Sequence, residues 1–519
     1  MPNEKFNILW ADDEIDLLKP HLMFLRGKGY NMLTATSGAD AIEMVQSTPL
    51  DLVILDENMP GITGLETLSR IKLTHPELPV VMITKSEEEN IMDQAVGNKI
   101  ADYLIKPVNP NQILIAIKKI LHSDTLVSQR ATTDYRQDFT NIASEIGQAS
   151  DFADWCSLYS KLVYWEMELA SADTPMSEML KMQHGEANLA FAKYIRRNYE
   201  RWITPMGPAD DAPLMSPRVF ARRVLPLLDK GEKVFFIVID NFRLDQWRAI
   251  KPLLSDVFSF EEELYCSILP TATQYARNAI FSGLMPAQIA KTYPEMWVDE
   301  DSEEGKNLNE SPLVQSLLDR YRRKHSFLYT KINDSSTTAQ LLRDFRRLES
   351  YDLNILVVNF IDMLSHARTE SKMIRELASN DAAYRSLTLS WFRHNSILEL
   401  LRTIGERGFR IVLTTDHGTI RVDRPVKVVG EKNTNSNLRY KIGRNLGYNP
   451  KDVYEVKRPQ QIGLPAPNLT STYIFACEDD FFAYPNNYNH YVQYYTDTFQ
   501  HGGVSMEEML IPLVTLSPK

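Results

Sequence analysis

Cysteine is scarce in this sequence, which has 3 in 519 residues, at positions 156, 266 and 477. An odd number of widely spaced cysteines argues against a disulfide framework and is typical of a reducing compartment. Long hydrophobic runs are also missing: stretches such as Val234–Ile239 have the length of a strand, far below the roughly 18 residues of a membrane span. The first residues, MPNEKFNILWADDE, lack the basic and apolar regions of a signal peptide. We therefore expect a cytoplasmic protein without membrane insertion.

An excess of positive charge is absent as well, since 57 Lys and Arg stand against 68 Asp and Glu, for a net charge of −11. This balance disfavours a basic coat for long nucleic acids. The negative charge lies early in the chain: residues 1–121 carry −6, residues 122–205 carry −4 and the remaining residues carry −1. No helix-turn-helix pattern or basic recognition helix is evident, so we expect no sequence-specific DNA-binding motif.

The patterning of the chain changes twice along its length. Residues 1–121 alternate short apolar runs with helical patterns, which predicts a parallel sheet of about five strands. Residues 122–205 contain few Pro or Gly and repeat apolar and aromatic residues at helical spacing, which predicts an all-α helical bundle linker. Residues 206–519 return to alternating strands and helices. The predicted fold class is a multidomain α/β protein with three regions.

Polar residues follow four strand-like runs of residues 1–121. Asp12 and Asp13 come after the first run, Asp56 after the second, Thr84 after the third and Lys106 after the fourth. Because the carboxyl ends of parallel strands meet at one edge of a sheet, we expect these side chains to lie together. Three carboxylates suit Mg²⁺, and a carboxylate nucleophile beside a metal, a lysine and a hydroxyl suits phosphoryl transfer to that carboxylate.

This arrangement resembles the receiver domain of two-component response regulators, a flavodoxin-like doubly wound parallel sheet. The resemblance implies that a sensor histidine kinase leads to phosphorylation of Asp56, which promotes a homodimer through this domain. The implied Mg²⁺ ligands are Asp12, Asp13, Asp56 and the carbonyl of Asn58. The implied switch residues are Thr84, Tyr103 and Lys106. A receiver that folds but never accepts phosphate is disfavoured, because every key position is filled.

A second set of polar residues follows strand-like runs in residues 206–519. Asp240, Asp362 and Asp416 each lie at or just after such a run, and His417 follows Asp416 directly. One Asp at a strand end is usually a cap or turn residue, but three in one region favour a shared site. His366 lies four residues after Asp362, so both side chains share one face if this stretch is helical.

The late loop histidine His501 completes a set of three Asp and three His. A lone histidine is more often structural, yet this mixture of ligands suits Zn²⁺, with Mn²⁺ as the second choice. Paired metals about 4 Å apart clamp the attacking and leaving oxygens of a phosphoryl displacement. The predicted nucleophile is Thr271, which with Gln274 also has the spacing of a capping box at a helix N-terminus. Thr273 is the competing candidate.

The order of these residues from about Val234 onward resembles the alkaline phosphatase superfamily, and within it the PglZ branch. The Cys/Ser-x-Pro-x-Arg motif of the sulfatases in this superfamily is absent. The resemblance implies an alkaline-phosphatase-like α/β domain that holds two Zn²⁺ ions. The implied ligands of the first ion are Asp240, Thr271, Asp416 and His417. The implied ligands of the second ion are Asp362, His366 and His501.

A receiver (residues 1–121), a helical bundle (122–205) and a PglZ domain (206–519) together resemble the response regulators tied to type IX secretion. The resemblance implies a zinc-dependent phosphodiesterase acting on small linear or cyclic oligonucleotides, with secretion-system or sigma-factor proteins as further partners. Two alternatives stay open. The chain is an interaction protein gated by phosphorylation, with a catalytically dispensable output domain, or it is a phosphomonoesterase or phosphomutase with the same metal ligands.

Residues 421–444 hold seven basic side chains against two acidic ones. Such a run is more often a solvated charged loop. Because it follows His417 closely, we also consider it a phosphate-steering lid, in which an aromatic ring stacks on a base. The candidate substrate-binding residues are Arg421, Arg424, Lys427, Tyr440 and Lys441.

Overall fold

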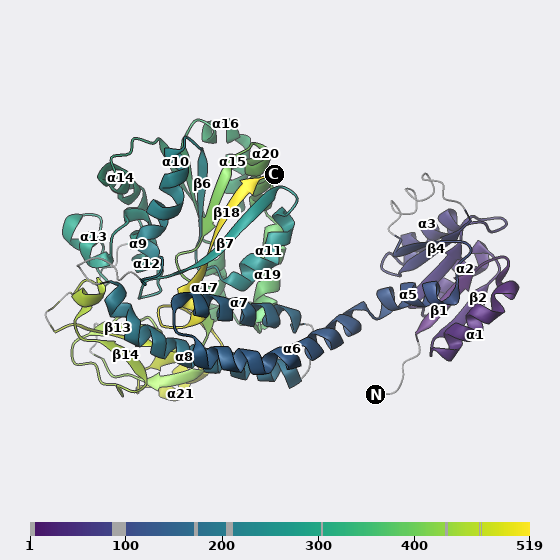
Figure 1. Ribbon diagram of the computed structural model, residues 1–519, viewed down its shortest axis with the longest axis horizontal. Coiled ribbons are helices and arrows are strands. Elements are labelled where there is room, and N and C mark those ends of the chain that lie inside the picture. Colours follow the sequence, from purple (N-terminus) through teal and green to yellow (C-terminus); the bar gives the residue numbers. More distant parts are fainter. Residues whose placement is uncertain are drawn as a thin grey trace. The chain divides into compact units, whose positions relative to one another are not determined.

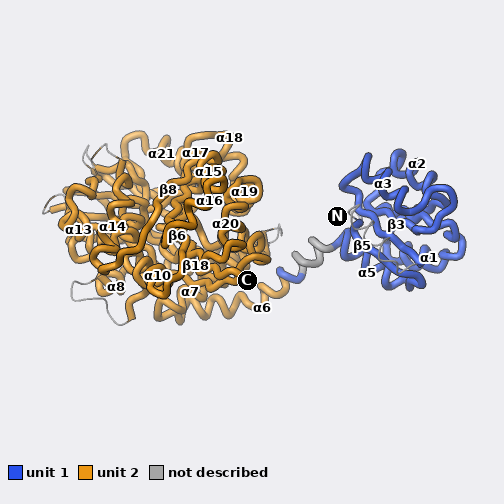
Figure 2. The backbone as a smooth tube through the Cα atoms, turned by 90° about the horizontal axis from the view of Figure 1, so that it is seen from above, with its two compact units in different colours: residues 1–131 blue, residues 132–519 orange. Residues whose placement is uncertain are grey.

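The computed structural model describes residues 6–85, 100–170, 175–203, 211–300, 302, 305–430, 434–466, 468 and 470–519. The chain forms two compact units, residues 1–131 and residues 132–519 (Figure 2). Among the helices of these described ranges, none is long and apolar enough to cross a membrane.

The first unit is built on a five-stranded parallel sheet with the strand order β2-β1-β3-β4-β5. Its strands are β1 (Asn7–Ala11), β2 (Asn31–Ala35), β3 (Leu52–Asp56), β4 (Val80–Thr84) and β5 (Asp102–Ile105). Its helices include η1 (Ile15–Leu18), α1 (Lys19–Gly27), α2 (Gly38–Ser47), α3 (Gly64–Thr74) and α5 (Pro110–Leu121). Strands β3 and β4 are buried along their whole length, as expected for apolar runs covered on both faces. The doubly wound parallel sheet predicted for this region is confirmed.

Three long helices follow in the chain: α6 (Ser123–Gln148), α7 (Phe152–Glu168) and α8 (Pro175–Trp202). The aromatic stripe of α7 is core, since Trp155 and Tyr159 are almost completely buried. Helix α7 begins at a capping box formed by Asp151 and Asp154. From residue 132 onward these helices belong to the same compact unit as the residues that follow them. The boundaries at residues 121 and 205 stay a prediction about regions of the sequence.

The second unit contains a six-stranded sheet with the order β7-β18-β10-β6-β9-β8 (Figure 1). The strands are β6 (Val234–Ile239), β7 (Phe258–Cys266), β8 (Phe327–Ile332), β9 (Leu353–Val358), β10 (Arg410–Thr414) and β18 (Leu510–Pro518). Strands β10, β6, β9 and β8 are parallel, whereas β18 pairs antiparallel with both β10 and β7. The carboxyl ends of β6, β9 and β10 therefore lie side by side.

Short helices connect the strands of this sheet. Before and after β6 and β7 lie α9 (Ser216–Val219), η2 (Phe220–Val224), α10 (Leu225–Asp229), α11 (Leu244–Ile250), η3 (Lys251–Leu254), α12 (Thr273–Ser282), α13 (Pro286–Thr292) and α14 (Glu310–Arg320). Between β8 and β10 lie α15 (Ser335–Arg343), α16 (Phe345–Leu348), α17 (Phe360–Glu370), α18 (Lys372–Leu377), α19 (Asp381–His394) and α20 (Ser396–Glu406). Helices α12 and α17 begin close to the carboxyl edge of the sheet, where they can present side chains to a site.

Three small sheets follow β10. Strand β11 (Ile420–Arg421) pairs with β17 (Phe499–Gln500), β12 (Arg424–Lys427) pairs with β16 (Asp480–Ala483), and β13 (Tyr440–Gly443) and β14 (Val453–Val456) flank β15 (Thr472–Ala476). The remaining elements are η4 (Pro459–Ile462), α21 (Tyr488–Tyr495) and α22 (Met506–Met509). Part of the basic segment at residues 421–444 thus lies in short strands that pair with other parts of the unit, and the described residues between these strands form loops. Its role as a lid stays a prediction.

Candidate active sites

The first unit gathers its predicted acidic residues at one sheet edge. Ligand oxygens of Asp12, Asp13 and Asp56 lie within 4.8 Å of one another, and Asp12 and Asp56 are buried. The Lys106 ammonium lies 2.9 Å from Asp12 Oδ2 and 3.0 Å from Asp56 Oδ1. Burial raises the pKa of Asp56 although the Lys106 cation opposes it. The three carboxylates could therefore bind a divalent cation, either together with the Lys106 ammonium or in its place.

The predicted switch pair is also in contact. The side chains of Thr84, at the end of β4, and Tyr103, in β5, form a hydrogen bond. Thr84 is completely buried, whereas Asn58 is exposed. The ring position of Tyr103 is therefore tied to the hydroxyl beside the acidic cluster.

The second unit holds a buried cluster of Asp240, Asp416 and His417, whose ligand atoms lie within 4.8 Å of one another. The Nδ1 atom of His417 lies 3.0 Å from the carbonyl oxygen of Gly418, so Nε2 faces the carboxylates, 3.7 Å from Asp240 Oδ1. The Oδ2 atom of Asp416 is buried and has no hydrogen-bond partner in the described part of the chain. A buried carboxylate oxygen without a donor fits a cation ligand.

The electrostatics of this cluster favour a cation for the same reason. Burial, reinforced by the neighbouring Asp416 carboxylate, raises the pKa of Asp240 to about 7. Burial also raises the pKa of Asp416, against the opposing effect of Arg277. Two buried carboxylates that resist ionisation side by side become stable anions when a divalent cation lies between them.

A guanidinium beside the cluster already provides part of that compensation. Arg277, 3% exposed, donates from Nη1 to Asp240 Oδ2 at 2.7 Å and from Nε to Glu310 Oε1 at 2.5 Å. It projects from α12, one turn after Thr273. Arg277 therefore fixes the position of the Asp240 carboxylate.

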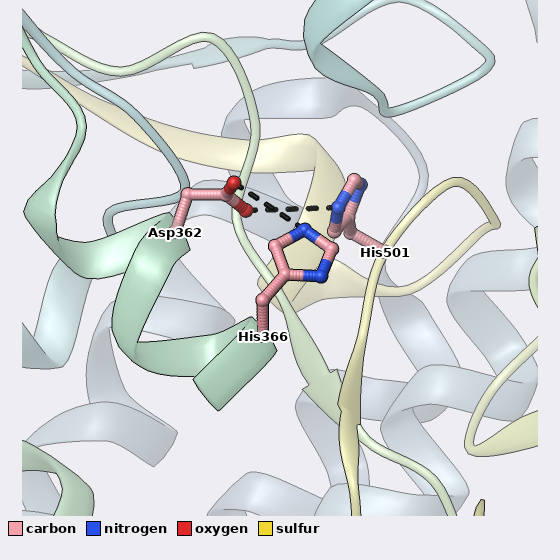
Figure 3. A group of neighbouring side chains, drawn as sticks. All are labelled: Asp362, His366 and His501. Atoms are coloured by element: carbon pink, nitrogen blue, oxygen red, sulfur yellow. Dashed lines mark ion pairs between the residues drawn. The ribbon is translucent and has the colours of Figure 1, made fainter. Parts of the chain in front are cut away.

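A second cluster joins Asp362, His366 and His501 (Figure 3). Asp362 and His366 lie four residues apart on α17, and His366 Nε2 is 3.4 Å from Asp362 Oδ2. His501 follows β17, and its Nε2 lies 3.8 Å from Asp362 Oδ1. The His366 side chain is 65% exposed, so this cluster opens to solvent. The predicted helical pairing of Asp362 with His366 is what the structure shows.

The charges of the second cluster suit metal ligation. Burial and the neighbouring His417 lower the pKa of His501 to about 4, which keeps its imidazole neutral. Burial opposes ionisation of Asp362, but the hydrogen bond from His366 lowers its pKa below the usual range. A neutral imidazole and an ionised carboxylate are the forms that bind zinc.

The two clusters form one site. The rings of His417 and His501 stack with centroids 4.2 Å apart and an interplanar angle of 19°. Asn241, which adopts the left-handed conformation with φ 61°, donates from Nδ2 to Asp362 Oδ1 at 3.2 Å and from its backbone N–H to Asp416 Oδ1 at 3.4 Å. Asn tolerates this conformation better than most residues, and the turn lets one residue contact both clusters, through its side chain and its backbone.

The two candidate nucleophiles differ in the contacts of their hydroxyl groups. Thr273, not Thr271, directs its hydroxyl to the first cluster: Oγ1 lies 3.2 Å from Asp240 Oδ1 and 3.1 Å from His417 Nε2. The hydroxyl of Thr271 is fully buried, donates to the carbonyl oxygen of Gly503 at 2.9 Å and accepts from the N–H of Gly502 at 3.0 Å.

Thr271 is not the N-cap either, because the N-cap residue of α12 is Ala272. Its carbonyl oxygen instead lies 3.1 Å from His501 Nδ1 and orients that ring. Thr271 thus links the loop before α12 to the loop that carries His501 through hydrogen bonds.

Three of the candidate substrate-binding residues have other partners. Tyr440 is 4% exposed and donates from its hydroxyl to Glu300 at 2.8 Å, so its ring is not available to stack on a base. Lys441 is 1% exposed and donates to the carbonyl oxygen of Asn435. Arg424 forms a two-point ion pair with Asp480 across the β12–β16 pair. The predictions for Tyr440 and Lys441 are wrong, because these side chains are buried. The Arg424 side chain is 58% exposed, and its contact with substrate stays a prediction.

The other two candidates are Arg421 and Lys427. Arg421, a quarter exposed, lies 3.5 Å from Asp381 and lines a cavity of about 530 Å³ beside α7 and α8. The Lys427 ammonium lies over the ring of Tyr488, 4.7 Å from its centroid. Their contact with substrate stays a prediction.

Sequence reasoning missed Arg277 and Asn241. Each had a signal: Arg277 is a charged residue inside the apolar stretch that leads from Tyr275 to Phe281, and Asn241 directly follows a predicted ligand. An isolated arginine in an apolar helix face is usually paired with buried acids.

Three family models match the chain in succession. They are the response regulator receiver domain at residues 8–118, the PorX response regulator linker domain at residues 125–203, and the BREX system PglZ alkaline phosphatase-like domain at residues 219–516. Receiver and alkaline phosphatase-like domains both imply the use of metal ions, in agreement with the acidic and histidine clusters.

The following curated relatives match about a quarter of the chain. Transcriptional regulatory protein ZraR is 32% identical over 134 residues in Klebsiella oxytoca (26% of this chain, 30% of that protein) and 34% identical over 121 residues in Escherichia coli K12 (23% and 27%). The alginate biosynthesis regulator AlgB of Pseudomonas syringae pv. tomato is 33% identical over 114 residues (22% and 25%). The chain thus spans less than a third of the length of these relatives.

Solved structures that match are receiver domains too. The chemotaxis protein CheY4 of Vibrio cholerae is 25% identical, with a TM-score of 0.22, and the match covers 22% of this chain and 98% of that one. A receiver domain from Clostridium thermocellum is 28% identical, with a TM-score of 0.22, covering 23% and 98%. Receiver, linker and output domain follow one another in the order of PorX response regulators. Because the PglZ match alone covers more than half of the sequence, the chain belongs to the PglZ alkaline phosphatase-like family.

Proposed function

We propose that this response regulator carries a zinc-dependent phosphodiesterase as its output domain, acting on small linear or cyclic oligonucleotides. The observation that carries the proposal is the pair of Asp/His clusters at one sheet edge, with the Thr273 hydroxyl in contact with two ligands of the first cluster. Three carboxylates and three imidazoles suit two Zn²⁺ ions better than Mg²⁺, which prefers oxygen ligands.

The residues divide into two groups by role. Asp240, Asp416 and His417 would hold one ion, and Asp362, His366 and His501 the other. Zinc bound there would lower the pKa of a coordinated hydroxyl and neutralise charge on the phosphoryl oxygens. Thr273 Oγ1, after loss of its proton to solvent, would form the new bond to phosphorus while the bond to the departing alkoxide breaks on the opposite side. Water would then cleave the bond between Thr273 and phosphorus and restore the hydroxyl.

The surrounding residues hold this geometry. Arg277 and Asn241 orient the carboxylates, and the carbonyl oxygens of Gly418 and Thr271 orient the two stacked imidazoles. Such outer contacts fix the tautomer that leaves Nε2 free to bind a metal.

The charge of the site supports a diester over a monoester substrate. In the described part of the chain, the guanidinium in contact with the clusters is that of Arg277, and it is already bonded to Asp240 and Glu310. Two zinc ions against three carboxylates leave one net positive charge. A diester carries one negative charge and a monoester carries about two at neutral pH, so the diester is the better match.

The test is hydrolysis by the zinc-loaded protein of bis-p-nitrophenyl phosphate, p-nitrophenyl phosphate and short RNAs. We expect two zinc ions per chain and a kcat/KM for the diester well above that for the monoester. Thr273→Val should lower kcat by at least about a hundredfold while Thr271→Val keeps more activity. A wild-type protein that binds zinc but cleaves none of the substrates contradicts the proposal, and preference for the monoester changes the substrate class.

We propose further that phosphorylation of Asp56, with Mg²⁺ held by Asp12, Asp13, Asp56 and the Asn58 carbonyl, controls this output. A sensor histidine kinase supplies the phosphoryl group, and phosphorylation promotes a homodimer through the receiver. The physiological setting is type IX secretion, with secretion-system or sigma-factor proteins as further partners. The buried Asp12–Asp56–Lys106 arrangement supports the acceptor role.

Light scattering with beryllofluoride and Mg²⁺ tests this control. We expect the mass to shift from monomer toward dimer in the wild type and to stay unchanged in Asp56→Ala. In cells, Thr273→Val separates catalysis from interaction: a phenotype that Asp56→Ala abolishes and Thr273→Val leaves intact favours a phosphorylation-gated interaction protein. An unshifted mass with Asp56 demonstrably modified contradicts the proposed dimer.

A further inference from the structure

Helix α8 contacts the loop that leads to Thr273. The backbone N–H of Leu269 donates to the hydroxyl oxygen of Tyr199 at 2.6 Å, and the Tyr199 side chain is completely buried. Leu269 lies four residues before Thr273, in the same loop as Thr271, whose carbonyl oxygen orients His501. A residue of the helical region thus holds the backbone from which the proposed nucleophile projects.

The same helix contacts the second loop of the site. The side chain of Asn188 is 4% exposed; its Oδ1 atom accepts from the N–H of Met506 at 2.8 Å, and its Nδ2 atom donates to Glu507 at 2.9 Å. The next residue, Glu508, accepts from the N–H of Gly503 at 2.8 Å, two residues after His501. Asn188 therefore fixes the first turn of α22, which in turn holds the glycines behind a proposed metal ligand.

Both contacts are sensitive to small changes. Replacing either side chain by an apolar one leaves a buried backbone N–H without an acceptor, which costs about 1–3 kcal/mol unless the loop moves. A displaced loop misaligns the reacting atoms, and a misplacement of about 1 Å lowers a rate by about a hundredfold. One loop leads to Thr273, which contacts the first cluster, and the other carries His501 of the second cluster. Helix α8 therefore contacts the loops of both clusters.

We infer that Tyr199 and Asn188 of α8 are positioning residues for the phosphoester reaction. The helical region is then part of the catalytic unit, in addition to joining it to the receiver. This inference rests on the proposed function, because it assigns the two residues a role in that reaction.

The test compares Tyr199→Phe and Asn188→Leu with a matched control, Tyr135→Phe. Tyr135 is completely buried in α6 and donates its hydroxyl to Gln183 at 2.8 Å, so the control removes a similar bond within the helices alone. We expect kcat for bis-p-nitrophenyl phosphate to fall at least about tenfold in the two α8 variants with KM nearly unchanged. The control should keep kcat within about twofold, with a similar loss of thermal stability.

Hydrogen exchange gives a readout that does not depend on activity. Amides of residues 267–273 should exchange faster in Tyr199→Phe than in Tyr135→Phe, because the loop has lost its acceptor in α8. Absence of hydrolysis by the wild type rejects the proposed function itself. An active wild type whose Tyr199→Phe and Asn188→Leu variants keep kcat, or lose no more than the control, overturns this inference alone.

Discussion

Arg277 is the residue whose loss should change the protein most without removing a proposed ligand. Its guanidinium forms ion pairs with both Asp240 and Glu310, and all three side chains are almost completely buried. Removing one partner of a buried pair leaves uncompensated charge, at a cost of about 3–5 kcal/mol. We expect Arg277→Met to lower the free energy of unfolding by about this amount without metal, measured by denaturant titration.

Zinc should restore part of the lost free energy of unfolding in Arg277→Met, because a cation between the carboxylates replaces the missing positive charge. The control is Arg402→Met, which removes a largely exposed ion pair with Asp256 and should cost less than about 1 kcal/mol. Equal losses in the two variants would contradict a special role of Arg277.

Lys441 gives a prediction in pH. Burial lowers the pKa of its ammonium from 10.5 to about 7, with Glu300 opposing the shift. Between pH 7 and 10.5 the folded state therefore holds fewer protons than the unfolded state, so the free energy of unfolding rises with pH. Below pH 7 the lysine is protonated in both states, so it no longer makes the free energy of unfolding depend on pH.

We expect this lysine to add about 2 kcal/mol to the free energy of unfolding between pH 7 and pH 9, since each pH unit is worth about 1.4 kcal/mol. Lys441→Met should show a flatter profile over that range in denaturant titrations. A profile parallel to that of the wild type would mean that the ammonium stays charged in the fold.

The grouping of three aspartates at one sheet edge could be predicted from the sequence, because the carboxyl ends of parallel strands converge. That rule places Asp240, Asp362 and Asp416 without any knowledge of loops. The choice between Thr271 and Thr273 could not be made, because it depends on which residue is the N-cap of α12. The burial of Tyr440 and Lys441 likewise depends on strand pairing far along the chain.

At the scale of elements, the loop that carries His417 packs closely against α22. Gly418 approaches that helix so nearly that a Cβ atom would lie 2.0 Å from the carbonyl oxygen of Glu507. We expect Gly418→Ala to destabilise the second unit by about 1–3 kcal/mol or more and to reduce zinc content, because the loop with Asp416 and His417 must move.

The matched control for this variant is Gly147→Ala. Gly147 lies in α6, and an added Cβ meets nothing within 4 Å. Alanine there should stabilise the helix by about 0.5–1 kcal/mol. Calorimetry and metal analysis of both variants decide the point: unchanged zinc content in Gly418→Ala would mean that the loop absorbs the new atom.

Elements were predictable where their pattern was long. The buried strands β3, β6 and β9 and the helices α7 and α8 follow from continuous apolar runs and helical periodicity. Strands β11, β12 and β13 are two to four residues long and rich in charge, so the same rules indicate a loop. Their strand conformation comes from partners that lie about 30 to 80 residues later in the chain.

At the scale of the whole molecule, two compact units predict two unfolding transitions. A ligand stabilises only the unit that binds it, by about 2.7 kcal/mol at a concentration a hundred times its Kd. We expect beryllofluoride with Mg²⁺ to raise the Tm of the receiver transition alone and zinc to raise the other alone. Calorimetry of the full chain measures both, and one transition that responds to both ligands would show that the units unfold together.

The site of the second unit draws its residues from position 240 to position 501, whereas that of the receiver needs only positions 12 to 106. Contacts between distant positions require closure of long loops and form late in folding, and larger proteins fold one domain at a time. The receiver site therefore assembles early, by itself. Under the proposed function, a newly made chain would pass through a stage in which it could accept a phosphoryl group before it could cleave an ester.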